Sequence, residues 1–212
     1  MDANFWLERW DAGQTGFHNE DVNPNLVRHL PEVSLPVGSH VFVPLCGKTR
    51  DISWLLAKGH QVTGVELSQL AIDQLFDEMG VQPEVSDTGA LTAFRSEGVV
   101  VYSGDFFKLT SEMLRAVDLI WDRAALVALP EAMRFEYSSH LRSLTDNAPQ
   151  LLVTLEYDPA EMDGPPFFVT ADEVNRHYAD HYDIRPLRLA AATDPLKGRV
   201  TATENVWHLS RR

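Results

Sequence analysis

The hydrophobic residues of this chain form short runs that alternate with stretches of helical spacing. Five largely apolar runs have the length and composition of buried strands: 41–43, 62–65, 99–102, 118–121 and 151–155. After the second run, apolar residues recur at Ile72, Leu75, Phe76 and Met79, the i, i+3, i+4, i+7 pattern of an amphipathic helix. This alternation predicts an α/β fold with a mostly parallel sheet and helices on both faces.

The last part of the chain has a different pattern. Residues 183–190 and 204–209 look like two strands joined by a polar loop, which predicts a C-terminal antiparallel hairpin. Residues 81–97 are polar and mixed, and we expect a loop there with a short strand or a turn of helix. The 212 residues suit one domain over 1–212, in which 1–30 forms an N-terminal lid or cap.

Charge and cysteine content narrow the classes of function. The chain has 18 Lys and Arg against 31 Asp and Glu, a net charge of −13, which disfavours nucleic acid and anionic membranes as partners. Its first 30 residues lack the apolar core of a signal peptide, and no apolar run approaches membrane-spanning length. The single cysteine, Cys46, excludes an internal disulfide and suits a reducing compartment, so we expect a cytoplasmic protein.

The segment from 41 to 66 is a predicted βαβ unit with a carboxylate at its end. The strand 41–43 leads into the turn 44–48, where Gly47 can adopt backbone angles that other residues resist. A helix follows, and the second strand ends at Glu66, 19 positions after Gly47, close to the spacing of an acid that binds a ribose. Because no G-x-G-x-x-G is present, the sequence disfavours a dinucleotide and favours a nucleoside without phosphates.

The carboxyl ends of the predicted strands carry the polar residues of a candidate site. In open parallel sheets the ligand binds beyond these ends. The residues there are the turn 44–48, Glu66, Asp105 with Phe106, Asp122 with Arg123, and the loop after Leu155. Together they predict one binding crevice.

The N-terminal segment is rich in aromatic residues and has two interpretations. Trp6 and Trp10 are four positions apart, so a helix places both on one face. The segment is either a helix packed on the domain or a lid over a ligand, continued by Phe17 and His18. His18 could move a proton, although a lone histidine is more often structural. The eight histidines show no zinc-type spacing, and we expect no metal.

Four segments together resemble the thiopurine S-methyltransferase family nearly end to end: FWLERWDAGQTGFH, VFVPLCGKTRDISWLLAKGHQVTGVELS, IWDRAALVAL and YDPAEMDGPPFFV. The resemblance implies a Rossmann-like class I methyltransferase fold with a seven-stranded sheet. It implies S-adenosyl-L-methionine as cofactor, S-adenosyl-L-homocysteine as product, and methyl transfer to the sulfur of thiopurines and aromatic or heterocyclic thiols. Bacterial members are associated with selenium and tellurium compounds and with tellurite resistance.

The resemblance also implies roles for single residues. The expected cofactor contacts are Trp10, Leu45, Gly47, Glu66, Asp105, Phe106 and Arg123. Glu66 would accept hydrogen bonds from the ribose hydroxyls, and the aromatic face of Trp10 would attract a sulfonium. Phe17 and His18 would lie on the acceptor side. From the sequence alone, Phe106 is also compatible with an ordinary core position.

Arg123 is the predicted catalytic residue. A thiolate is a better nucleophile than a thiol, and a fixed guanidinium nearby would lower the pKa of the acceptor. Arginine stays protonated and is a poor base, so its expected role is electrostatic. The alternative is a surface ion pair with Asp122.

Three hypotheses follow from these residues. The first is an S-adenosylmethionine-dependent thiol or chalcogen methyltransferase acting on small molecules, probed best by methyl transfer itself. The others are a nicotinamide-dependent oxidoreductase, which lacks its glycine fingerprint here, and a non-catalytic nucleoside-binding domain. We expect a monomer. The segment 193–203 departs from the animal members of the family, so the resemblance leaves the natural acceptor open.

Overall fold

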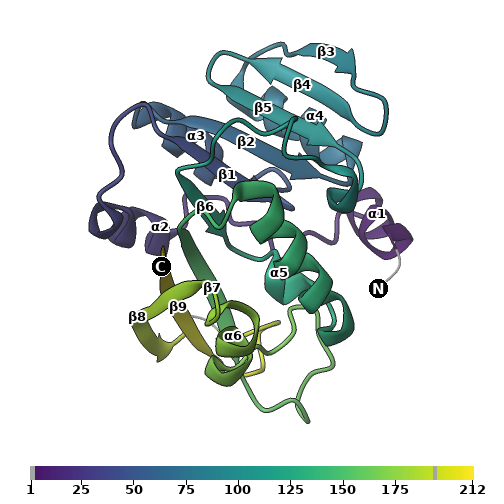
Figure 1. Cartoon of the computed structure of the whole chain (residues 1–212). Coiled ribbons are helices and arrows are strands. Elements are labelled where there is room, and N and C mark those ends of the chain that lie inside the picture. The colour runs from purple at the N-terminus through teal and green to yellow at the C-terminus, as the bar shows by residue number, and fades with distance from the viewer. Residues whose placement is uncertain (1–2, 193–194) are drawn as a thin grey trace. The chain divides into compact units, whose positions relative to one another are not determined.

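The computed structural model describes residues 3–192 and 195–212, and the chain divides into two compact units, 1–119 and 120–212 (Figure 1). The helices and strands of the first unit are α1 (Ala3–Asp11), α2 (Pro24–His29), η1 (Leu30–Val33), β1 (His40–Pro44), α3 (Arg50–Ala57), β2 (Gln61–Glu66), α4 (Gln69–Met79), β3 (Glu84–Asp87), β4 (Thr92–Ser96), β5 (Val99–Ser103) and η2 (Phe106–Lys108). Those of the second unit are β6 (Leu119–Asp122), η3 (Leu126–Ala128), α5 (Glu131–Thr145), β7 (Gln150–Glu156), α6 (Ala171–Tyr178), β8 (Tyr182–Ala191) and β9 (Thr203–Arg211).

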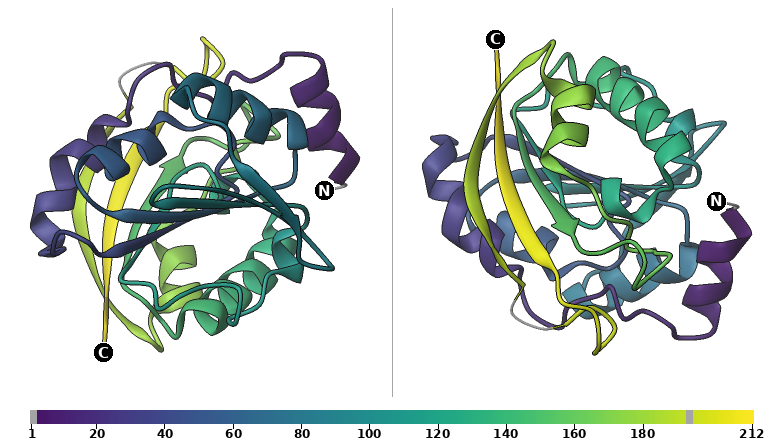
Figure 2. Two further views of the ribbon diagram at one scale, coloured as in Figure 1. Left: turned by 90° about the horizontal axis from the view of Figure 1, so that it is seen from above. Right: turned by 90° about the horizontal axis from the view of Figure 1, so that it is seen from below.

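The first unit contains five strands in the spatial order β3-β4-β5-β2-β1, and helices α3 and α4 pack against them. Strands β1, β2 and β5 are parallel, whereas β3 and β4 form an antiparallel hairpin that continues onto β5. All five residues of β1 are buried, as expected for a strand covered on both faces. The views of Figures 1 and 2 show α1 beside α4. The carboxyl ends of β1, β2 and β5 therefore lie along one edge of this sheet.

Local sequence signals place the helices of this unit. The Ser68 hydroxyl accepts a hydrogen bond from the amide of Ala71 at the start of α4, and Gly80 ends α4 with φ 69°. Gly64 in β2 serves a different purpose, because a Cβ there would lie 2.8 Å from Cys46 Sγ. Only glycine lets the turn after β1 approach β2 so closely.

The second unit contains four strands in the spatial order β6-β7-β9-β8. Strands β6 and β7 are parallel, and the last two strands are antiparallel, with a register shift between Pro186 and Arg188 where β8 pairs with β9. Helix α6 packs on β8 and also contacts α5.

The predicted α/β fold with parallel central strands and a C-terminal antiparallel pair is confirmed, but the predicted count of seven strands is wrong. The described residues contain nine strands. The additional pair is the hairpin β3–β4, in the segment 81–97 where we expected a loop with a short strand or a turn of helix. Three of the four residues of β3 are exposed, so an edge strand of this kind lacks the apolar alternation by which strands are recognised.

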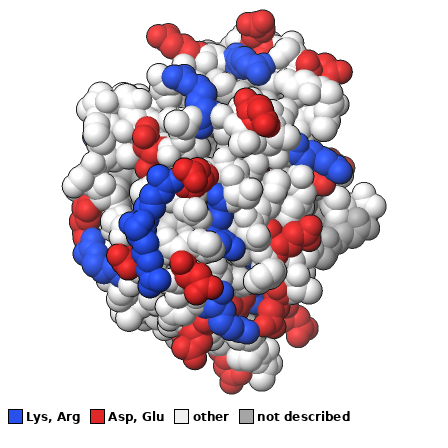
Figure 3. Space-filling view, viewed as in Figure 1, with Lys and Arg blue, Asp and Glu red and all other residues white. Residues whose placement is uncertain are grey.

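The acidic excess of the chain does not gather into one patch on the face in Figure 3, where Lys and Arg side chains lie among Asp and Glu. Within 3–192 and 195–212, no helix is both long and apolar enough to cross a membrane.

Candidate active site

Glu66, the last residue of β2, lies at the centre of the polar contacts at the strand ends of the first unit. Its side chain is 6% exposed; Oε2 accepts a hydrogen bond from the Gly47 amide at 2.7 Å, and Oε1 accepts one from the Ser68 amide at 2.8 Å. Burial raises the pKa of Glu66, and these backbone donors offset part of the increase.

Glu66 has no cation partner among the described residues. A buried carboxylate is costly when its oxygens lack hydrogen-bond donors. Each oxygen can accept more bonds than the one it receives from the backbone, so the pair can also bind two vicinal hydroxyls. Glu66 thus stands at the strand end where an acid that binds a ribose is expected, and its contact with a ribose stays a prediction.

The turn between β1 and α3 carries unusual backbone angles at two residues. Gly47 has φ 53°, as the sequence predicted, and Leu45 has φ 47°, which the sequence did not indicate. A leucine in this left-handed region costs about 1–3 kcal/mol, and such residues gather at binding sites. The turn returns to the sheet through the amide of Cys46, which donates to the Val65 carbonyl at 3.0 Å. Backbone groups of 45–47 are thereby held beside Glu66.

Aromatic residues of the N-terminal segment pack on this turn. A Cβ on Gly47 would lie 3.1 Å from Trp10 Cζ2, and Trp10 is only 4% exposed. The ring of Phe17 lies edge-on to Trp10 and Trp6, with centroids 5.5 and 5.6 Å away. The structure thus brings Trp10, Phe17, Gly47 and Glu66 together, and α1 places both tryptophans against one ring. The mobility of this segment as a lid stays a prediction.

Asp105 and Phe106 follow β5 and are tied to the same edge. Ser103 pairs with Glu66 across the strands, and the amide of Gly104 donates to the Glu66 carbonyl at 2.9 Å. The exposed Asp105 carboxylate caps η2 by accepting from the Phe107 amide at 3.0 Å. The Phe106 ring is 3% exposed, so it belongs to the core, and its adenine contact stays a prediction.

Lys48 and Arg50 meet at Glu78 on α4. Lys48 donates to Glu78 at 2.7 Å, and Arg50 lies 3.2 Å from the other carboxylate oxygen. The bond from Lys48 is the main cause of the lowered pKa of Glu78, and the charges of Arg50 and His18 contribute less. Lys48 therefore anchors the turn on α4, at the place where the predicted lid continues.

In the second unit, Arg123 follows the end of β6 and is half-buried. Asp122 is 0% exposed, so it is not the surface residue that the alternative of an exposed ion pair assumed. Its carboxylate accepts from the Leu126 amide at 3.1 Å and from the Tyr137 hydroxyl at 2.8 Å. Burial raises the pKa of Asp122 to about 6. Sequence reasoning missed this buried acid, since a carboxylate after an apolar strand resembles an exposed strand end.

We expect Asp122→Asn to change how stability depends on pH. A carboxyl group whose pKa rises on folding from 3.8 to about 6 favours the folded state below pH 4. This contribution is lost as the pH rises to about 6, where ionisation costs up to about 3 kcal/mol. Asparagine can still accept from the Leu126 amide and donate to the Tyr137 hydroxyl, and it never ionises. The melting temperature of the variant minus that of the unmodified chain should therefore increase from pH 4 to pH 7.

Thermal unfolding from pH 4 to 8 checks this expectation. The control is Asp180→Asn, which removes the same charge from an exposed position of the second unit. A melting-temperature difference for Asp122→Asn that stays constant over this range would contradict the buried-acid interpretation.

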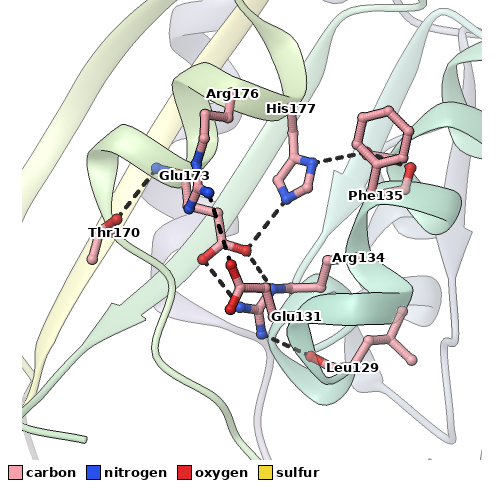
Figure 4. A network of polar contacts seen from close by, with 9 residues as sticks. Leu129, Glu131, Arg134, Phe135, Thr170, Glu173, Arg176 and His177 are labelled. Atoms are coloured by element: carbon pink, nitrogen blue, oxygen red, sulfur yellow. Dashed lines mark hydrogen bonds and ion pairs between the residues drawn. The ribbon is translucent and has the colours of Figure 1, made fainter.

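A second buried network joins α5 to α6 (Figure 4). Arg134 donates to both carboxylate oxygens of Glu173, at 2.5 and 3.0 Å, and the two side chains are 3% and 4% exposed. His177 Nε2 lies 3.3 Å from the same carboxylate, and its Nδ1 lies 3.2 Å from the Ser138 hydroxyl. Thr170 and Glu173 match the sequence pattern of a capping box, yet only the Thr170 half forms, because the Glu173 side chain is held by Arg134.

Comparison with known proteins identifies the family of the chain. The family model of thiopurine S-methyltransferase matches residues 1–212. A thiopurine S-methyltransferase of Xanthobacter autotrophicus is 49% identical over all of both chains. One of Teredinibacter turnerae is 46% identical over 100% of this chain and 98% of its own.

Solved structures of lower identity show the fold. The 1,6-didemethyltoxoflavin-N1-methyltransferase of Burkholderia thailandensis, solved with bound S-adenosylhomocysteine, has a TM-score of 0.66 at 16% identity, covering 98% of this chain and 87% of its own. The magnesium protoporphyrin IX methyltransferase of Synechocystis has a TM-score of 0.64 at 12% identity, covering 100% of both chains. With the full-length family match, these similarities lead to one conclusion: the chain belongs to the thiopurine S-methyltransferase family and is an S-adenosylmethionine-dependent methyltransferase.

Proposed function

We propose that this enzyme methylates the sulfur of thiopurines and of other aromatic or heterocyclic thiols. The observation that carries the proposal is the match of the thiopurine S-methyltransferase model to residues 1–212. The buried carboxylate of Glu66 beside the glycine turn supports the cofactor part of this assignment. Selenium and tellurium compounds are further candidate acceptors, because they share the polarisable nucleophile of a thiol.

The residues of the first unit are proposed to bind and orient the cofactor. When bound, S-adenosylmethionine supplies a methyl group attached to a positively charged sulfur. Glu66 would hold the ribose, and the backbone of Leu45 and Gly47 would orient the methionine part. The ring face of Trp10 would attract the sulfonium by about 0.5–2 kcal/mol. Asp105 and Phe106 would border the adenine, whereas Phe17 and His18 would meet the acceptor.

Arg123 is proposed to act on the acceptor through its charge. A guanidinium within a few ångströms of a thiol favours the thiolate and lowers the pKa of that thiol. The thiol proton would pass to water, since arginine cannot accept it. The enzyme then contributes position, exclusion of water and this single charge.

The test is methyl transfer from labelled S-adenosylmethionine to mercaptopurine, thiophenol, selenite, tellurite, catechol and glycine. We expect label on the thiols, with thiols ahead of catechol and no label on glycine. Their order relative to selenite and tellurite decides whether chalcogen detoxification is part of the role. Label on catechol in preference to every thiol would contradict the proposed acceptor class.

Arg123→Ala should slow transfer most for acceptors that are not yet ionised. We expect kcat/KM for the weakly acidic benzyl mercaptan to fall about 10- to 100-fold, with its rise against pH displaced to higher pH, because the acceptor loses its stabilising charge. The kcat/KM for the more acidic 4-nitrothiophenol should fall less than that for benzyl mercaptan. The affinity of the variant for S-adenosylhomocysteine should stay largely intact. Steady-state kinetics from pH 6 to 10 and calorimetry measure these effects.

The matched control is Arg176→Ala, which removes an exposed arginine from the same unit. Equal losses for both thiols with an unchanged pH profile would show that Arg123 does not act on acceptor ionisation.

We also propose that the enzyme works in the cytoplasm as a monomer. Its only cysteine is a buried thiol whose pKa is raised by burial, which suits a reducing compartment where no disulfide is needed. Sedimentation of the purified chain measures its oligomeric state.

A further inference from the structure

A cavity lies in the first unit at the end of the sheet opposite to Glu66. Its walls come from α2, η1 and the loop that leads into β1, and from the end of α3 and His60 just before β2. These are the amino ends of β1 and β2, whereas Glu66 ends β2 at its carboxyl end. The cavity measures about 550 Å³, which lies within the range of small-molecule sites. We refer to it as the Trp54 pocket.

The Trp54 pocket combines apolar walls with one flexible cation. Leu30, Pro36 and Val37 form the wall on the loop side, and Val37 is 82% exposed although it is a valine. On the α3 side, the Lys58 ammonium lies 5.3 Å from the centroid of the Trp54 ring. No acidic side chain lines the pocket in the described part of the chain, although the protein carries a net charge of −13. The local charge therefore favours an anion.

His60 adds a buried polar group without a partner. The residue is 7% exposed, and its Nδ1 atom has no hydrogen-bond partner among the described residues. Burial lowers the pKa of His60, so the imidazole is neutral at pH 7. The Nδ1 atom is closed off from solvent, so His60 adds an uncharged ring to the wall of the pocket and leaves Lys58 as its one charged side chain among the described residues.

We propose that the Trp54 pocket binds a planar aromatic carboxylate. The aromatic part would lie against Trp54 and the apolar wall, burying surface that is now exposed, and the carboxylate would pair with Lys58 at the rim. A cationic ligand would be repelled by the Lys58 charge, and a neutral arene would leave the Lys58 ammonium without an added partner. The site is separate from the cofactor residues, so its occupancy does not require methyl transfer.

The experiment titrates 2-naphthoate, with 2-naphthalenemethanol as the neutral comparison, into the full chain saturated with S-adenosylhomocysteine. Calorimetry should show that naphthoate binds at least 5-fold more tightly than the alcohol. Lys58→Gln should remove this preference. Arg28→Gln is the matched control, because it removes one positive charge from an exposed position of α2 that does not line the pocket. It should leave naphthoate affinity unchanged.

Nuclear magnetic resonance locates the bound ligand independently of affinity. The chain has five tryptophans, and Trp54→Phe assigns the indole signal of Trp54. Naphthoate should shift this signal. The Lys58→Gln enzyme should methylate an acceptor thiol at the same rate as the unmodified enzyme. The proposal is overturned if naphthoate does not bind, if Arg28→Gln weakens it as much as Lys58→Gln, or if only other indole signals shift.

Discussion

Replacing Glu66 by alanine should weaken binding of S-adenosylhomocysteine by about 100- to 10,000-fold. Hydrogen bonds to a charged group are worth about 1.5–3 kcal/mol each, and two ribose hydroxyls would lose theirs together. Glu66→Gln keeps the shape of the side chain and removes its charge, so its loss should be smaller but in the same direction. Calorimetric titration of both variants measures the change.

The pH dependence of affinity adds a second measurement on the same residue. Because burial raises the pKa of Glu66, this carboxylate is protonated at a higher pH than an ordinary one when the solution is acidified. The affinity of the unmodified enzyme for S-adenosylhomocysteine should therefore begin to fall at that higher pH. Glu66→Gln should lose this part of the pH dependence.

The Glu66 side chain also holds the amides of Gly47 and Ser68, so the variants need a test of folding. Circular dichroism and the melting temperature without ligand separate lost binding from lost structure. Glu84→Gln removes the same charge from an exposed residue of β3 and should bind as the unmodified chain does. A folded Glu66→Ala enzyme that binds S-adenosylhomocysteine with full affinity would contradict the cofactor assignment.

Glu173→Ala should destabilise the protein by about 3–5 kcal/mol, because it leaves the buried Arg134 guanidinium without its partner. For a chain of this size that corresponds to a fall of about 10 °C in melting temperature. Burial by itself raises the pKa of Glu173, but hydrogen bonds from His177 and Arg134 outweigh it and hold the pKa below its ordinary value. The stabilisation is therefore present above pH 4.5, the ordinary value, and is lost as the pH falls below it.

An exposed ion pair between the same two helices provides the control. Arg176 and Glu131 lie 3.8 Å apart and are 65% and 72% exposed, so Glu131→Ala should change the free energy of unfolding by no more than about 0.5 kcal/mol. The double variant Arg134→Met with Glu173→Leu should cost much less than the sum of its single changes, because neither charge is left alone. Urea unfolding of these variants measures the free energies. Equal costs for Glu173→Ala and Glu131→Ala would show that burial of the pair contributes nothing.

Much of the first unit could be predicted from local pattern. Helical periodicity and the Ser68 and Gly80 caps place α4 within a residue of its observed bounds. The spacing of Gly47 and Glu66 anticipates their contact, because strands β1 and β2 are joined by one helix and end side by side. The resemblance to a known family then assigned chemistry to residues that periodicity alone could not distinguish from core.

Other features depend on partners far apart in the sequence. For 81–97 we expected at most one short strand, and the hairpin β3–β4 was not predicted because the exposed residues of β3 give no alternation of apolar and polar side chains. Arg134 and Glu173 are 39 positions apart, and neither position alone indicates that its charge is buried. The segment 193–203 stays open as an acceptor determinant, and 193–194 lie outside the described residues.

The sequence by itself determined the alternation of parallel strands and helices, the caps of α4 and the acid at the end of β2, because these follow from periodicity and from backbone preferences that act within a few residues. Only the tertiary structure decided which polar groups are buried. Asp122 became a buried acid, Arg134 and Glu173 became a closed ion pair, and Lys58 and His60 came to border an apolar cavity. Burial is a property of everything packed around a side chain, so no local stretch of sequence can specify it.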